Sequence, residues 1–145
     1  MTVKRILILL SLLWGGLFIT GAGVSPSANE GEMRIIAANE VLEEDVFFGG
    51  IYFENNGVIN GSLYVASEKA LINGTVRGNL ILASSDAVIN AHVTGDVFLA
   101  AQGATFTGIT DGSIFTAGET LDFQASTNVA RSIYAAGSQV SLYGA

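Results

Sequence analysis

The residues that could carry catalysis in this chain are few and scattered. Its one histidine, His92, falls in a polar corner between two apolar stretches, and general acid–base catalysis would need a second group converging on it. Asp96 and Asp111 occupy different positions of the repeat described below. Arg77 and Arg131 fall in separate units of that repeat. We therefore interpret His92 as a solvated turn residue, and we expect a protein that is not an enzyme and has no cofactor.

Oxygen ligands for a metal ion are concentrated in one acidic run, which places four carboxylates between residues 40 and 45. Such a run can bind a divalent cation weakly. The glycine- and aspartate-rich repeat of calcium-binding β-helices is absent from the sequence. We interpret the run as a charged entry that keeps water at the first coil, and we expect no metal site. Asn60 and Asn73 match the glycosylation sequon, but we attribute both to corners of the repeat.

The composition narrows the possible partners. The formal net charge of the 145 residues is −7, so we expect no nucleic-acid partner, because phosphate binding needs Lys and Arg. The sequence has no cysteine, which excludes disulfides, thiolate chemistry and cysteine-based zinc sites. Half of the residues are hydrophobic, which is typical of a folded domain.

The N-terminal segment has the layout of an export signal. Lys4 and Arg5 precede an apolar run, Ile6–Ile19, and small residues follow. The run is short for a membrane span, which needs roughly 20 residues. Residues 1–28 are therefore predicted to be a signal peptide or, alternatively, an uncleaved N-terminal anchor helix. Either interpretation predicts an exported protein, extracytoplasmic or at the cell surface, and the anchor interpretation adds association with the membrane.

The remainder of the chain is dominated by an internal repeat with a period of about 17 residues. Three consecutive units read GSLYVASEKALINGTVR, GNLILASSDAVINAHVT and GDVFLAAQGATFTGITD from Gly61. A looser copy begins at Glu44, a unit two residues longer begins at Gly112, and a shortened unit begins at Arg131. A partial unit, RIIAANEVLE, precedes them. We expect residues 29–43 to be an acidic linker and entry, residues 44–145 to form the repeat domain, and the extra two residues to form a bulged corner near 125–128.

Equivalent positions of the repeat, which we call columns, predict the fold. The third and fifth columns are apolar, as are the tenth and twelfth, and residues two apart share one face of a strand. Stacked coils need the same residue class in every 17th position, whereas a hairpin meander does not. The sequence therefore predicts an all-β fold, a single-stranded parallel β-helix (a solenoid) of about six coils. The third column reads Val46, Leu63, Leu80, Val97, Ile114 and Ile133.

Two further columns carry small or turn-forming residues. Asn and Gly recur at the corners, where we expect a left-handed backbone that these residues tolerate. The sixth column is small in every unit, as at Ala66, Ala83 and Ala100. We expect it to mark the place where the backbone turns inward and leaves no room.

Three phrases of the repeat resemble a known family. GDVFLAA, the corner VING or LING, and the entry AANEVLEEDVFFGG are similar to the polymer-forming cytoskeletal proteins, or bactofilins, and to exported bacterial and archaeal proteins with that repeat. The resemblance covers about residues 34–145. It implies a right-handed, triangular β-helix that polymerises end to end without nucleotide and serves as a scaffold. Typical bactofilins are cytoplasmic, whereas this chain begins with an export signal.

The two ends of the predicted solenoid suggest self-association. Uncapped ends of a β-helix present open strand edges, and a head-to-tail contact between copies does not close, so it produces filaments. Ile133, Val140 and Leu142 would line the C-terminal edge, and Val46 and Phe48 the N-terminal edge. The last unit stops at Ala145 without a polar cap, so we expect the chain to be part of a longer protein.

The fourth column supports a second hypothesis, because alternation along the strand points it outward. A ladder of this kind would contact another rod, a membrane or cell-envelope component, or a further domain. Alternatively, the N-terminal segment shields it, or stacking simply stiffens the strands. The second functional hypothesis is an exported binding module, an adhesin or sensor ectodomain that recognises a partner protein or a glycan. The column reads Phe47, Tyr64, Ile81, Phe98, Phe115 and Tyr134.

Overall fold

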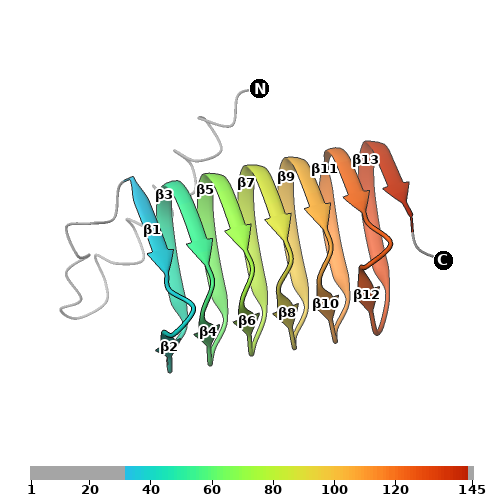
Figure 1. Ribbon diagram of the computed structural model, residues 1–145. Helices are drawn as coiled ribbons and strands as arrows, with labels where there is room; N and C mark the ends of the chain where they lie inside the picture. Colours follow the sequence, from blue (N-terminus) through green and yellow to red (C-terminus); the bar gives the residue numbers. More distant parts are fainter. Residues whose placement is uncertain (1–31, 144–145) are drawn as a thin grey trace, which may run out of the picture.

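The computed structural model describes residues 32–143 as a solenoid of stacked parallel β-coils (Figure 1). This part of the chain contains strands and turns but no helix, so the predicted all-β class and parallel coils are confirmed. The N-terminal signal or anchor helix predicted in residues 1–28 lies outside the described residues. Among residues 32–143, no helix is long and apolar enough to cross a membrane.

Two parallel sheets run the length of the rod. A seven-stranded sheet holds the long strands and a six-stranded sheet holds the short ones. The seven-stranded sheet consists of the four-residue β1 (Met33–Ile36) and the long strands β3 (Val46–Asn55), β5 (Leu63–Ile72), β7 (Leu80–Ile89), β9 (Val97–Phe106), β11 (Ile114–Phe123) and β13 (Ile133–Leu142). The short strands are β2 (Val41–Leu42), β4 (Val58–Ile59), β6 (Thr75–Val76), β8 (His92–Val93), β10 (Ile109–Thr110) and β12 (Asn128–Val129).

The strand register confirms the period of the repeat. Leu63 of β5 pairs with Leu80 of β7, which pairs in turn with Val97 of β9, so each coil advances the chain by one unit of the repeat. Between β11 and β13 the step is longer by the two extra residues, because Ile114 pairs with Ile133. The partial unit before Glu44 also belongs to the solenoid, since β1 pairs with β3 and β2 pairs with β4.

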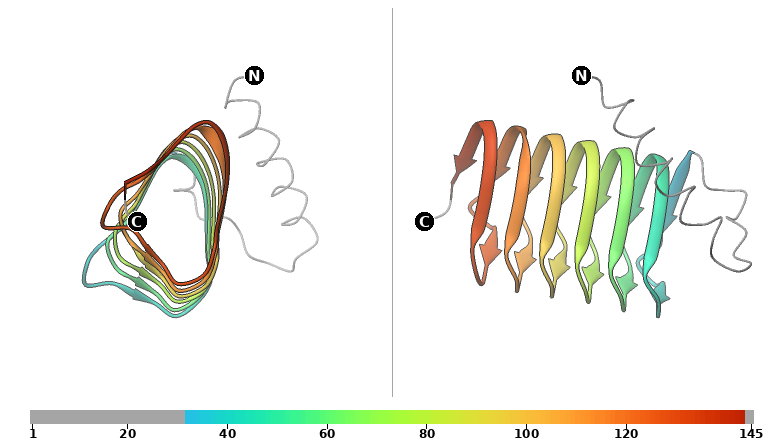
Figure 2. Two further views of the ribbon diagram at one scale, coloured as in Figure 1. Left: turned by 90° about the vertical axis from the view of Figure 1, so that its right-hand side faces the viewer. Right: turned by 180° about the vertical axis from the view of Figure 1, so that it is seen from behind.

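The two extra residues of the longer unit lie where the sequence predicts them. Four residues, 124–127, connect β11 to β12, whereas two residues, 107–108, connect β9 to β10. The wider corner is closed by a hydrogen bond of 2.9 Å from the Thr127 N–H to the Gln124 carbonyl. The first coil has an equivalent turn at residues 37–40, where the Glu40 N–H donates to the Ala37 carbonyl at 3.0 Å. Both wide corners protrude from the end-on outline (Figure 2).

The core consists of columns that stack on themselves. Leu63, Leu80 and Val97 of the third column are fully buried, as the alternation predicts. In the twelfth column Phe106 and Phe123 stack with ring centroids 4.4 Å apart and an interplanar angle of 4°. Because burial of each such side chain stabilises the fold by roughly 1.5–3 kcal/mol, stability is a sum over neighbouring layers.

Our expectation for the sixth column is wrong, because the close approach between coils occurs in the seventh column and only in the later coils, at Gly118 and Gly137. In the earlier coils the same column holds the buried side chains of Ser67 and Ser84. The ladder skips the eighth position, since Ser67 pairs with Ser84 and the next pair is Lys69 with Asp86. The long strand therefore bends here, and a Cβ atom on Gly118 of the seventh column would lie 2.1 Å from the Ala101 carbonyl oxygen. The sixth-column side chains of the later coils point outward and are exposed.

The corner residues also have a different role from the one we expected. A Cβ atom on Gly74 would lie 1.9 Å from the Gly57 carbonyl oxygen, so glycine is required by the close approach of the previous coil. None of the corner glycines Gly57, Gly74 and Gly108 has a left-handed backbone. The corner asparagines form an amide ladder, in which Asn73 donates to Asn56 at 2.8 Å and Asn90 donates to Asn73 at 2.7 Å.

Candidate functional site

Among residues 32–143, the last coil has core columns that no further coil covers. Ile133, Val140 and Leu142 are 37%, 40% and 62% exposed. Their counterparts one coil earlier, Ile114, Leu121 and Phe123, are exposed by 1% or less. The same inward-facing columns are thus buried in the inner coils and open to solvent at this end. We call the surface formed by Ile133, Val140 and Leu142 the open end.

Within the described chain, the backbone at the open end also lacks hydrogen-bonding partners on one side. Among the described residues, β13 pairs only with β11, and β12 pairs only with β10. One edge of β13 therefore presents a row of N–H and C=O groups without strand partners, which is a template for pairing with another strand. The strand is ten residues long, Ile133–Leu142, and alternate residues direct their N–H and C=O groups to this free edge.

A hollow enters the solenoid at the same end. It has a volume of about 350 Å³ and is lined on one side by Phe123, Val129, Ile133 and Leu142. Gln124, Thr127 and Arg131 form its polar rim at the wide corner. The lining is therefore mixed, with apolar side chains on one side and polar groups on the other, and the hollow has room for a side chain from an additional coil.

The second column adds a directional series of hydrogen bonds. Each side chain of this column accepts the backbone N–H of the same column in the next coil. The Asp45 carboxylate accepts from Ser62 at 2.7 Å, and the Asp96 carboxylate accepts from Ser113 at 2.7 Å. In the last coil Ser132 holds the equivalent position. We did not predict this role, although the alternation of Asp, Ser and Asn in the column is visible in the sequence.

At the N-terminal end, strand β1 covers only the second half of β3 among residues 32–143, from Tyr52 to Asn55, so the predicted residues Val46 and Phe48 lie on an open strand edge. Their side chains are buried inside the first coil, and Phe48 packs against Phe53 at 5.2 Å between ring centroids. Arg34 occupies the tenth column in β1, because it pairs with Phe53, and its side chain is exposed. A charged residue thus stands in a core column at this end.

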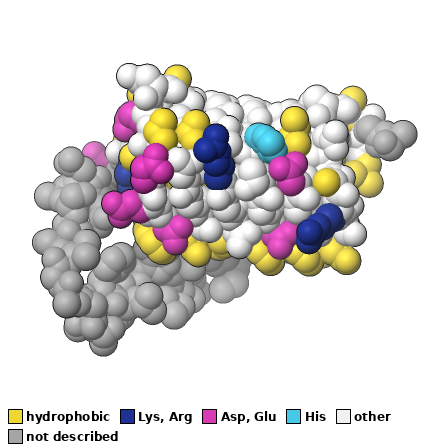
Figure 3. Space-filling view, turned by 90° about the horizontal axis from the view of Figure 1, so that it is seen from below, with side chains coloured by type: hydrophobic (Ala, Val, Ile, Leu, Met, Phe, Trp, Pro, Cys, Tyr) yellow, Lys and Arg dark blue, Asp and Glu magenta, His cyan; other side chains and the backbone are white. Residues whose placement is uncertain are grey.

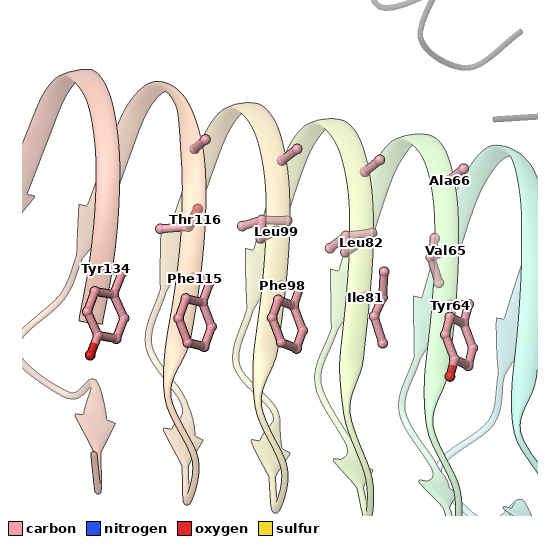
Figure 4. A pocket seen from close by; sticks show the side chains of 13 residues that line it. Tyr64, Val65, Ala66, Ile81, Leu82, Phe98, Leu99, Phe115, Thr116 and Tyr134 are labelled. Atoms are coloured by element: carbon pink, nitrogen blue, oxygen red, sulfur yellow. The ribbon is translucent and has the colours of Figure 1, made fainter. Parts of the chain in front are cut away.

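The fourth column forms a ladder on the outside of the seven-stranded sheet, as the alternation predicts (Figure 4). Phe98 stacks on Phe115 at 5.1 Å and Phe115 stacks on Tyr134 at 4.9 Å between ring centroids. These three side chains are exposed, and Tyr64 and Ile81 are half-buried. We call the five residues Tyr64, Ile81, Phe98, Phe115 and Tyr134 the fourth-column ladder. In the first coil Phe47 continues the column and stacks on Tyr64 at 4.6 Å.

A lateral groove runs beside the ladder. It has a volume of about 630 Å³, and the small sixth column, including Ala83, Ala100 and Ala117, lines it opposite the rings. Positions three to seven of every unit from Glu44 onward contain no charged residue. The groove is therefore apolar and uncharged over the coils from Tyr64 to Tyr134.

None of the residues considered for catalysis and metal binding lines the lateral groove, whereas Arg131 lines the hollow at the open end. The one histidine is exposed beside an acidic side chain (Figure 3), and its Nε2 atom lies 2.9 Å from Oδ2 of Asp111 on the next coil. Two carboxylates of the acidic run are hydrogen-bonded within the solenoid, since Glu40 accepts the backbone N–H of Ala37 and Glu43 accepts a side-chain amide N–H of Asn60, both at 2.9 Å. Within residues 32–143 no three potential ligands gather into a metal site.

One local pair at the N-terminal end has shifted acidities. The Tyr52 hydroxyl donates to the Glu54 carboxylate, and Asn56 donates to the same carboxylate at 2.6 Å. The hydrogen bond from Tyr52, followed by that from Asn56, lowers the pKa of Glu54. The same hydrogen bond to Glu54, followed by partial burial, raises the pKa of Tyr52.

Comparison with known proteins adds no relative. No family model, curated protein or solved structure matches this chain.

Proposed function

We propose that this protein is a non-catalytic structural scaffold whose copies associate end to end. The observation that carries the proposal is the open end, where Leu142, Val140 and Ile133 are exposed in columns that are buried one coil earlier. A further coil would cover them, and in the proposed assembly a second copy supplies that coil.

The contact combines three features of the last coil. The free edge of β13 pairs with a strand of the second copy, the hollow beside Phe123 accepts a side chain of that copy, and Ser132 accepts a backbone N–H. Each large apolar side chain that becomes buried contributes roughly 1.5–3 kcal/mol before the cost of association is subtracted. If the second copy contributes its N-terminal coil, the contact is head to tail and does not close, so filaments result.

The family, the winding and the location belong to the same proposal. The resemblance of residues 34–145 to bactofilins supports a scaffold that polymerises without nucleotide. Right-handed winding is the hand that parallel strand connections favour. The basic and apolar start of the chain supports export, with the assembly outside the cytoplasm.

A second candidate function is favoured by the lateral groove, which the end-to-end contact leaves uncovered. An exported binding module would use the fourth-column ladder and the groove to recognise a partner protein or a glycan. Such a module would form a defined monomer or small oligomer, and it would bind its ligand saturably.

Electron microscopy of negatively stained residues 29–145, the chain that the predicted cleavage leaves, separates these functions. The scaffold predicts unbranched filaments whose length increases with protein concentration. Leu142→Lys should abolish them, because it places a charge on the open end. Thr94→Lys adds the same charge at an exposed corner and should leave the filaments intact. Discrete particles at every concentration would reject the scaffold and favour the binding module.

A further inference from the structure

The lateral groove is an exposed apolar surface that the end-to-end assembly does not use. One wall is the fourth-column ladder, in which Phe98, Phe115 and Tyr134 are exposed. The other side is the sixth column, in which Ala100 and Ala117 are also exposed. A continuous surface of this kind marks a site for another apolar element. The small side chains allow the backbone of that element to approach the sheet closely, and the rings provide contact along its length (Figure 4).

We propose that the groove binds the apolar N-terminal segment of the same chain, Ile6–Ile19, whenever that segment is retained and is not in a membrane. The dimensions agree. As a helix, a segment of about 14 residues extends about 21 Å. The groove between Tyr64 and Tyr134 spans four steps from coil to coil, or about 19 Å at roughly 4.8 Å per step. Both surfaces are uncharged, since Ile6–Ile19 contains no ionisable residue.

The residues that join the apolar segment to the solenoid, 20–31, are long enough to allow this placement. The described chain begins at Glu32, whose carbonyl accepts the N–H of Ile51 at 3.0 Å and of Tyr52 at 2.9 Å. This position is at the bend of the first coil, next to the half of the long strands that carries the groove. Residues 20–31 can extend over about 40 Å at roughly 3.3–3.6 Å per residue, which is more than the length of the groove.

A second copy is a poorer occupant of the groove than the tethered segment. A strip about 19 Å long and about 10 Å wide buries on the order of 200 Å² on each side, whereas a stable interface between separate proteins needs about 800 Å² per partner. A tethered segment binds from an effective concentration in the millimolar range, so the same small area is sufficient. This proposal does not depend on end-to-end association, because the groove lies along the side of the rod.

The full chain offers two convenient probes. Trp14, in the middle of the apolar segment, is its only tryptophan, and the chain contains no cysteine. In the double variant Leu10→Cys, Ala100→Cys, a short bis-maleimide can therefore cross-link the two introduced cysteines without reacting at any native cysteine. The control pairs the same Leu10→Cys with Thr94→Cys, an exposed corner outside the groove. We expect an intramolecular cross-link at Ala100 in several-fold higher yield than at Thr94.

Trp14 fluorescence gives an independent readout at low protein concentration. Docking predicts blue-shifted emission that is shielded from acrylamide, and Ala100→Arg, which places a charged side chain in the groove, should reverse both effects. Thr94→Arg should change neither. Equal cross-linking at Ala100 and Thr94, or Trp14 emission that Ala100→Arg leaves unchanged, would overturn the proposal. Cross-links only between copies, from Ala100 to Ala100 or from Leu10 to another chain, would also overturn it and assign the groove to a second copy. None of these outcomes changes the expectation for Leu142→Lys, so the two proposals succeed or fail separately.

Discussion

The two ends of this solenoid are built from the same repeat but differ in the side chains that their core columns expose. At the C-terminal end the core columns are apolar and exposed, as Leu142 and Val140 show. At the N-terminal end the first-coil residues Val46 and Phe48 are buried, and Arg34 stands in the tenth column. The inner coils are interchangeable, so the chemistry of a single layer at each end determines which end can accept a further coil.

The N-terminal end has features that natural sheets use to protect an edge. Strand β1 has only four residues, and a charge in a core column opposes stacking on that column. The acidic run follows, with Glu40 and Glu43 in hydrogen bonds at the surface. The C-terminal strand β13 is ten residues long and has no charged residue. Association is therefore expected to depend first on the C-terminal end.

The largest predicted effect separates the inner coils from the open end. Phe106 is buried and stacked on Phe123, so Phe106→Ala should lower the free energy of unfolding by about 3–5 kcal/mol. Leu142 is mostly exposed, so Leu142→Ala should cost the monomer less than about 1 kcal/mol. Urea unfolding at low protein concentration measures both variants. Equal losses would mean that the last coil is packed as tightly as the inner ones.

The next prediction tests whether the charge of Arg34 in a core column weakens association at the N-terminal end. Arg34→Leu restores an apolar tenth column, so a head-to-tail contact should become about tenfold tighter, equivalent to about 1.4 kcal/mol. The affinity is measured by sedimentation velocity over a range of concentrations. An unchanged affinity would contradict the head-to-tail contact and would indicate that C-terminal ends pair with each other.

A smaller effect concerns a polar atom buried in the fifth column. The Thr116 side-chain oxygen is buried without a hydrogen-bond partner among the described residues, so Thr116→Val should stabilise the fold by about 1 kcal/mol. Ser84 is the matched contrast, because its hydroxyl donates to the carbonyls of Asp86 at 2.8 Å and Glu68 at 3.1 Å. Ser84→Ala should destabilise by a similar amount. Thermal unfolding tests the opposite signs.

The smallest effect is a pH dependence at the N-terminal end. The folded-state pKa of Glu54 is lowered by Tyr52 and Asn56, so its contribution to stability is present above the ordinary carboxyl pKa. That contribution is lost as the pH falls through the lowered value. The pKa of Tyr52 is raised, so its contribution is lost as the pH rises through the raised value. In unfolding experiments across pH, Tyr52→Phe should reduce the change in stability at both acidic and alkaline pH. If the loss of stability at acidic pH were the same in Tyr52→Phe as in the native chain, the role of this hydrogen bond would be contradicted.

Much of the fold could be predicted because coil-to-coil contacts join equivalent positions of successive units, so each column is visible in the sequence. The buried third column, the outward fourth column and the bulge at residues 124–127 follow from that spacing. The bend at the seventh column could not be predicted, because it depends on how closely the Ala101 carbonyl approaches Gly118 across coils. The glycine corners were misinterpreted for the same reason.

The two ends of the solenoid show the same limit of prediction from the sequence. The open end was predicted at Ile133, Val140 and Leu142, and these residues are exposed there. The N-terminal edge was predicted at Val46 and Phe48, which lie on the half of β3 that β1 does not pair with, although their side chains are buried. Aligning RIIAANEVLE would have placed Arg34 in the tenth column and Ile36 in the twelfth. The lateral groove depends on side-chain exposure along the rod, which the repeat alone does not specify.

Sedimentation velocity of residues 29–145, with and without Leu142→Lys, tests most directly whether the open end is the association surface. The account predicts that the sedimentation coefficient of the native chain rises with concentration. Leu142→Lys should remain monomeric over the same range, and the corner variant Thr94→Lys should behave like the native chain. A native chain that stays monomeric at the highest concentration, or a Leu142→Lys chain that associates equally well, would contradict it.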